Sequence, residues 1–227
     1  HILMGSRNGY KMGNTQMLDS MVHDGLWDPY GDKHMGNCAE LCADKYEFSR
    51  EAQDAFALES YNRAQRAAKD GLFDSEMAPV FVPQRKGDPV SFTRDEGVRA
   101  DVNEESLAGL RPAFKKGGSV TPGNASQISD GAAAAVLASP EAVESMGLEP
   151  LARITGYAAG GTSPEMVMMA PQFAVENLEA RTGLSRHDFD LIEMNEAFAS
   201  GSCALVGAME LDAEKVNVNG GAIAIGH

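Results

Sequence analysis

Apolar and polar positions alternate in blocks along the second half of the chain, and these blocks predict strands joined by helices. A nearly uninterrupted run of small apolar residues suits a buried strand packed between layers, whereas shorter runs between turns suit ordinary strands. The expected strands are residues 130–139, 151–157 and 190–194, and the stretch 114–121 is expected to cross a Gly-Gly turn into a strand. The expected helices are residues 140–146, which Gly147 ends, and the segment from Pro171 to Gly183.

The first half of the chain has shorter and less regular elements. A loop or small hairpin is expected within residues 1–25, followed by a short helix at about 15–23. A longer helix runs from Ser49, a suitable N-cap, to about Lys69. Its expected stripe is Ala57, Tyr61, Ala64 and Ala68. Further expected elements are a helix at 34–45, strands at 77–83 and 90–92, and a helical turn at 104–110. Together these elements predict an α/β fold, with the first half laid over it as an insertion.

The composition is typical of a soluble globular protein, with 43% hydrophobic and 23% charged residues among 227. No apolar run approaches the ~20 residues of a membrane helix, and the first residues lack the features of a secretory signal. The formal net charge of −14 repels phosphates, so we expect neither nucleic acid nor a membrane as a partner. Three cysteines in a chain of this length are not a disulfide framework, which favours a reducing compartment, and we expect the cytoplasm.

His34, Cys38 and Cys42 are spaced four residues apart, so they stack on one face of the expected helix. Imidazole and thiolate are zinc ligands, but a structural zinc site needs four ligands and no fourth lies nearby in the sequence. Apolar neighbours favour a packed helix in which the cysteines behave as small hydrophobic residues. We therefore expect no metal.

Two polar side chains stand at the ends of apolar runs late in the chain. Asn195 follows the expected strand 190–194, and a helix is expected from Glu196. His227 follows a second apolar run, from Val216, which is rich in glycine and is also expected to be a strand. Ligands of α/β folds gather at the carboxyl ends of strands, so we expect the amide and the imidazole to be neighbours. One group can position a water while the other moves a proton, which suits acyl chemistry. The alternative interpretation is a cap residue and a closely packed strand.

The sequences of these two segments resemble two motifs of the thiolase family, in particular of the acetyl-CoA acetyltransferases. The segments are Asn195-Glu-Ala-Phe198 and Asn217-Val-Asn-Gly-Gly-Ala-Ile-Ala-Ile-Gly-His227, and the similarity extends along essentially the whole chain. It implies a layered α/β/α fold, present in part, with an inserted α+β loop domain. The implied parts are a loop domain at 1–124 for CoA binding and tetramerisation, the end of the N-terminal half at 125–149, and the start of the C-terminal half at 150–227.

The resemblance also implies roles for single residues. In thiolases the Asn holds a water, and this water and the His form an oxyanion hole for the thioester carbonyl, so Asn195 and His227 are the implied catalytic residues. His227 would also activate a nucleophilic cysteine. Phe198 and Met35 would line the acyl end of the pocket, which favours a short acyl group. The residues implied in binding CoA are Leu26, His34, Met35, Arg99, Ser106, Phe114, Ser126 and Ile128.

The implied reaction is the reversible Claisen condensation of two acetyl-CoA molecules to acetoacetyl-CoA and CoA through an acyl-cysteine intermediate. CoA is a substrate, and no further cofactor is implied. Thiolases use two cysteines, and none of Cys38, Cys42 and Cys203 matches their motifs. We expect both cysteines outside this chain, upstream of His1 and downstream of His227, so that the chain alone is inactive. A homotetramer, a dimer of dimers, is also implied. The alternatives are a 3-ketoacyl-CoA thiolase of fatty-acid β-oxidation and a non-catalytic CoA- or lipid-binding relative.

Overall fold

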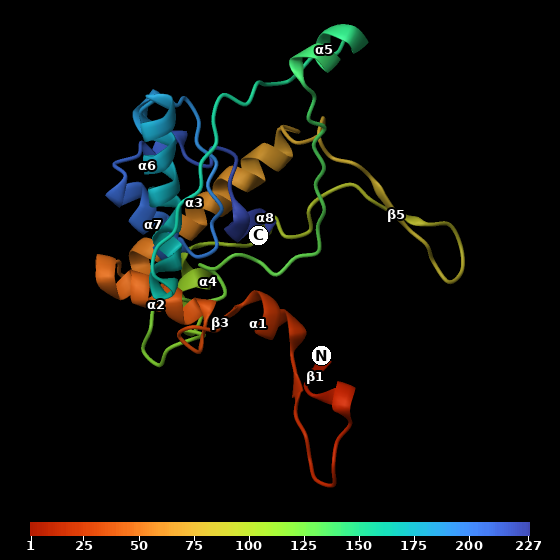
Figure 1. Cartoon of the computed structure of the whole chain (residues 1–227), viewed down its shortest axis with the longest axis vertical. Coiled ribbons are helices and arrows are strands. Elements are labelled where there is room, and N and C mark those ends of the chain that lie inside the picture. The colour runs from red at the N-terminus through yellow and green to blue at the C-terminus, as the bar shows by residue number, and fades with distance from the viewer.

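The computed structural model describes residues 1–227, and packed helices form the body of the molecule (Figure 1). The long helix α3 (Arg50–Lys69) packs against α7 (Ala199–Ala208) and the short helix α8 (Ala222–Ile225), while α2 (Met35–Tyr46) packs on α7. None of the helices combines the length and the apolar character that crossing a bilayer requires. The other helical elements are η1 (Ser6–Asn8), α1 (Ser20–Gly25), α4 (Glu104–Ala108), α5 (Pro140–Met146), η2 (Pro164–Met169), α6 (Ala170–Thr182), η3 (Arg186–Asp188) and η4 (Ala213–Lys215).

Helix α3 forms where the sequence predicts it. Ser49 caps its first turn by accepting a hydrogen bond from the backbone N–H of Ala52 at 3.2 Å. Its buried face carries the expected residues Ala57, Tyr61 and Ala64, packed on Ala199 of α7 and on Ile223 and Ala224 of α8. Ala68 is exposed, contrary to expectation, because the buried face continues from Ala64 to Ala67, three residues further on, and leaves Ala68 beside it.

Helix α2 buries the two cysteines that lie four residues apart. Cys38 and Cys42 have no exposed surface, and Cys42 packs with Ala204 and Leu205 of α7. His34 is the N-cap of this helix, and its Nδ1 accepts a hydrogen bond from the N–H of Gly36 at 3.0 Å. The packed-helix interpretation of this stretch is therefore correct.

Three small antiparallel hairpins account for all the strands. The first pairs β1 (Ile2–Leu3) with β2 (Met17–Leu18), the second β3 (Trp27–Asp28) with β4 (Lys33–His34), and the third β5 (Val80–Val82) with β6 (Val90–Phe92). The first and third were expected, and both project from the body in Figure 1. Helix α1 starts later than expected, because Asp19 is the N-cap and accepts a hydrogen bond from the N–H of Met21 at 2.9 Å.

Several segments that the sequence predicts as strands do not form strands. They are residues 114–121, 130–139, 151–157 and 190–194, and the glycine-rich run from 216, which forms a turn and helix α8. Their only ladder contact is a parallel bridge between Ile192 and Val216. Val136 and Leu151 lie outside any helix or strand, with 95% and 105% of their surface exposed. A strand needs backbone partners along its length, and apart from this bridge no segment of residues 1–227 pairs with these runs to provide them.

Candidate active site

Asn195 and His227 lie side by side at the surface of the helical body. Asn195 Nδ2 is 2.8 Å from His227 Nε2, and both residues are exposed. The parallel bridge between Ile192 and Val216 aligns the two segments that carry them. The juxtaposition expected from the sequence is therefore present, although one bridge replaces the two expected strands.

The amide group of Asn195 fixes the direction of this hydrogen bond. An amide nitrogen can only donate, so Asn195 Nδ2 donates and His227 Nε2 accepts. The neutral imidazole then carries its proton on Nδ1. Nε2 is thus the basic atom of the pair, and it lies beside an amide that can hold a water. This is a suitable arrangement for moving a proton next to a polarised carbonyl group.

The carboxyl group of Glu196 joins the two segments from the buried side. The residue is 1% exposed. Its Oε2 accepts hydrogen bonds from Ser60 Oγ at 2.6 Å and from the N–H of Ile223 at 3.2 Å, and its Oε1 accepts from Asn217 Nδ2 at 2.8 Å. This role was not predicted from the sequence, although a carboxylate inside an apolar stretch is a signal that it has buried partners.

The side chain of Asn217 forms two hydrogen bonds to the backbone of Met194, the residue before Asn195. Its Oδ1 accepts from the N–H of Met194 at 2.7 Å, and its Nδ2 donates to the carbonyl of Met194 at 2.8 Å. Asn217 adopts a left-handed backbone conformation with φ of 48°, which asparagine tolerates better than most residues. Burial, and then the charge of Glu196, raise the pKa of Glu193 in the same segment.

Four of the residues expected near CoA form one aromatic and apolar wall. The rings of His34 and Phe114 are stacked at 4.7 Å, and Phe114 meets Phe198 edge-on at 6.1 Å. Met35 packs in the same cluster, and its N–H donates to the carbonyl of Leu26 at 2.8 Å. Burial lowers the pKa of His34, so its ring is neutral at pH 7, as its role as an N-cap acceptor requires.

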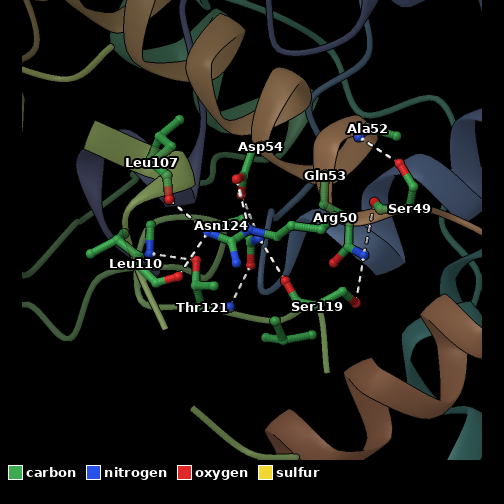
Figure 2. A network of polar contacts seen from close by, with 12 residues as sticks. Ser49, Arg50, Ala52, Gln53, Asp54, Leu107, Leu110, Ser119, Thr121 and Asn124 are labelled. Carbon is green, nitrogen blue, oxygen red and sulfur yellow. Dashed lines mark hydrogen bonds and ion pairs between the residues drawn. The ribbon is translucent and has the colours of Figure 1, made fainter. Parts of the chain in front are cut away.

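A second buried network fastens the loop that carries Ser126 (Figure 2). Asn124 is fully buried, and its Nδ2 donates to Asp54 Oδ1 of α3 at 2.8 Å and to the carbonyl of Ser119 at 3.0 Å. Two residues on, the N–H of Ser126 donates to the carbonyl of Ala197 at 3.0 Å. Ser126 is thereby held next to the segment that bears Asn195.

Three residues implied in CoA binding lie apart from the wall of His34, Met35, Phe114 and Phe198 and have other partners. Arg99 forms an exposed ion pair with Asp101, with 3.1 Å between Nη2 and Oδ2. The hydroxyl of Ser106 belongs to the capping box of α4, where it bonds to the backbone of Asn103. Ile128 is 75% exposed and contributes to no core cluster.

None of the three cysteines has the environment of a nucleophile. Burial raises the pKa of Cys38, raises that of Cys42 to about 11, and raises that of Cys203 to about 12. A thiol with so high a pKa is almost entirely protonated at neutral pH, and the thiolate is the reactive form. The chain also contains no group of three His, Cys, Asp or Glu side chains arranged to hold a metal ion.

Family models identify the fold to which this site belongs. The thiolase N-terminal domain matches residues 2–141, and the thiolase C-terminal domain matches residues 148–227. The chain belongs to the thiolase family.

Similar proteins include two named acetyl-CoA acetyltransferase. The protein from Chromobacterium violaceum is 51% identical over 227 residues, and that from Cupriavidus necator is 50% identical; each match covers 100% of this chain and 58% of the relative. Among solved structures, the Bacillus anthracis acetyl-CoA acetyltransferase has a TM-score of 0.96 at 41% identity, and human mitochondrial 3-ketoacyl-CoA thiolase has 0.94 at 40%. Both matches cover 100% of this chain and 57% of the solved chain. The chain thus spans a little over half the length of these relatives.

Proposed function

We propose that this chain is the CoA-binding and oxyanion-binding part of an acetyl-CoA acetyltransferase. The reaction is the reversible condensation of two acetyl-CoA molecules to acetoacetyl-CoA and CoA. The observation that carries the proposal is the contact between Asn195 and His227, 2.8 Å long and open to solvent. The names of two similar proteins, both called acetyl-CoA acetyltransferase, support the acetyl group as the group transferred.

In the proposed mechanism, His227 Nε2 takes the proton of a cysteine thiol, and the thiolate attacks the carbonyl carbon of acetyl-CoA. The carbon–sulfur bond to CoA breaks, and the imidazolium returns the proton to the departing thiolate. A second acetyl-CoA then gives an α-proton to the thiolate of a second cysteine, and its carbanion attacks the carbonyl carbon of the acetyl-cysteine. The carbon–sulfur bond of the acetyl-cysteine breaks, which releases acetoacetyl-CoA and restores the first thiolate. A water held by Asn195, together with the imidazole, stabilises the oxyanion that forms on the thioester oxygen.

The nucleophile is proposed to lie outside these 227 residues. Cys38 and Cys42 are fully buried, and the pKa values of all three thiols are raised, so none suits the role. A second cysteine, acting on the α-carbon, is proposed outside the chain for the same reason. The isolated chain should therefore be inactive.

The wall beside the reacting pair is proposed to enclose the acyl and pantetheine parts of CoA. Phe198 and Met35 limit the space at the acyl end, while Leu26, His34, Phe114 and Ser126 follow the pantetheine. Arg99 and Ser106 are assigned to the nucleotide end, and Ile128 is assigned as an apolar neighbour of Ser126 beside the pantetheine. No cofactor other than CoA as substrate is proposed.

The assembly is proposed to be a homotetramer in the cytoplasm. The β1–β2 hairpin projects from the body in Figure 1, so it is free to contact another subunit. Residues 1–124 form the proposed loop domain, 125–149 the end of the N-terminal thiolase half, and 150–227 the start of the C-terminal half.

The test is thiolysis of acetoacetyl-CoA by the intact protein that carries this chain. We expect activity in the wild type and a loss of about 10²-fold or more in kcat for Asn195→Ala, because one oxyanion group is removed. The matched control is Asn62→Ala, at an exposed position of α3, which should retain wild-type activity. An inactive wild type, or an Asn195→Ala variant with undiminished kcat, would overturn the proposal.

A series of 3-ketoacyl-CoA substrates addresses the alternative of a β-oxidation thiolase. The similarity in fold to the human 3-ketoacyl-CoA thiolase motivates this comparison. A preference in kcat/KM for long acyl chains would favour that alternative. Binding of CoA without any turnover would instead favour a non-catalytic relative.

A further inference from the structure

One buried carboxyl group lies where three separate parts of the fold meet behind the reacting pair. Glu196 directly follows Asn195 in the sequence, and its partners are Ser60 of α3, Asn217, and the backbone of Ile223 in α8. All three partners are neutral hydrogen-bond donors, and the carboxyl group acts only as an acceptor, which is the role of an ionised carboxylate.

The backbone that leads to His227 packs directly against this carboxyl group. A Cβ atom added to Gly221 would lie 2.4 Å from Glu196 Cδ. The N–H of Gly221 also donates to Ser60 Oγ at 3.1 Å, and Ser60 in turn donates to Glu196. Movement of the carboxyl group would therefore displace both Asn195 and the segment of His227.

We propose that Glu196 is a positioning residue that sets the distance between the Asn195 amide and the His227 imidazole. It touches neither reacting group and acts through Asn217, Ser60 and the N–H of Ile223. Its importance for catalysis rests on the proposed function, whereas its effect on the geometry of the pair does not. The substitution Glu196→Gln preserves size but replaces one acceptor oxygen by a donor, which must face another donor.

The geometric test follows the tautomer of His227 in the intact protein that carries this chain. In long-range ¹H–¹⁵N spectra, with His227 identified by comparison with His227→Gln, the wild type should show the proton on Nδ1, because Nε2 accepts from Asn195. Glu196→Gln should lose this hydrogen bond and shift His227 towards the Nε2-protonated form. If Glu196→Gln does not fold, Ser60→Ala removes one donor, leaves the carboxyl group in place, and should produce the same shift.

The matched control is Glu40→Gln. Glu40 is another buried carboxylate, 3% exposed, that accepts hydrogen bonds from the N–H groups of Ser119 and Val120. Both substitutions should lower the urea midpoint, but only the change at Glu196 should alter the His227 spectrum. An unchanged spectrum in folded Glu196→Gln, or an equal change in Glu40→Gln, would overturn the proposal.

The catalytic consequence is tested in the intact protein. Glu196→Gln should lower kcat by about 10²-fold, as expected for a small misplacement of reacting groups. KM should change by less than about twofold, because the wall that contacts CoA is untouched. Loss through KM alone would argue against positioning. If the wild-type protein has no thiolase activity, the proposed function fails while the spectroscopic result still decides the role of Glu196.

Discussion

Arg186 holds Glu179 through both arms of its guanidinium group, at the junction between α6 and η3. Its Nη2 lies 2.5 Å from Oε2 and its Nε 2.9 Å from Oε1, and its own backbone N–H donates to Oε1 at 2.7 Å. These hydrogen bonds, first those of the side chain and then that of the backbone, lower the pKa of Glu179 from 4.5 to about 2. The pair therefore ties the residues after Gly183 back onto α6.

The stability that this pair contributes should depend on pH in a defined direction. A carboxyl group whose pKa falls on folding stabilises the fold fully above its unfolded pKa, and this contribution fades as the pH falls from about 4.5 towards 2. Glu179→Gln should lower the melting temperature at pH 7, and its difference from the wild type should shrink over that window. Melting curves measured from pH 7 to pH 2 provide the test.

The control for this prediction is Glu144→Gln, at an exposed carboxylate of α5 that forms no hydrogen bond. It should follow the wild type at every pH. A constant difference between Glu179→Gln and the wild type down to pH 2 would contradict the assigned cause.

Whether a residue's partners are near or far in the sequence explains which residues of the site could be predicted. Asn195 and His227 were found because each ends an apolar run and because their motifs resemble those of a known family. Glu196 was missed as a structural residue, since its partners lie 136, 21 and 27 residues away. Ser106 shows the opposite case, because its capping box with Asn103 is local and could have been recognised from the sequence.

Among the elements, the turn that leads into α8 depends on one glycine. Gly220 has φ of +83°, and a Cβ atom there would lie 2.7 Å from the carbonyl oxygen of Ser60 and 2.7 Å from Ala64 Cβ on α3. Gly220→Ala should combine a left-handed penalty of about 1–2 kcal/mol with this overlap. We expect a larger fall in the free energy of unfolding than from the left-handed conformation alone, measured by urea denaturation.

Gly87, at the tip of the β5–β6 hairpin, is the matched control for this prediction. Its φ is +88°, but no atom lies within 4 Å of the Cβ position. Gly87→Ala should therefore show the backbone penalty without the overlap. Equal destabilisation by the two substitutions would mean that α8 can move away from α3 at no cost.

Elements with local signals, including two hairpins, were predicted well, and strands that need a distant partner were not. Ser49 and the alanine stripe specify α3, and Gly147 ends α5 in the left-handed conformation that favours glycine. The apolar runs 130–139 and 151–157 have the composition of strands, but composition supplies no partner. Whether such a run becomes a strand is decided by a neighbour that can be anywhere in the sequence.

For the molecule as a whole, the unpaired apolar runs leave apolar side chains exposed outside the helical body. Val136, Leu137 and Leu151 are exposed and lie outside any helix or strand, while the path of the whole chain follows that of a longer acetyl-CoA acetyltransferase with a TM-score of 0.96. Unpaired backbone beside apolar side chains promotes association between chains. We therefore expect the isolated chain to aggregate.

Val136→Lys should reduce this aggregation, measured by light scattering of the purified chain at a fixed concentration. The melting temperature should not change, because Val136 is 95% exposed and no packing is lost. Ser145→Lys, at an exposed position of α5, adds the same charge without removing an apolar side chain and should have little effect. A lower melting temperature for Val136→Lys would show that this segment is packed.

The β3–β4 hairpin places Trp27 opposite His34, and Trp27 is the only tryptophan in the chain. It is 38% exposed, and its Nε1 donates to Asp32 at 3.1 Å. Its fluorescence therefore originates from a single place, next to the ring that stacks on Phe114. Titration with CoA, followed by emission intensity and wavelength, would report occupancy of that wall without any attached dye.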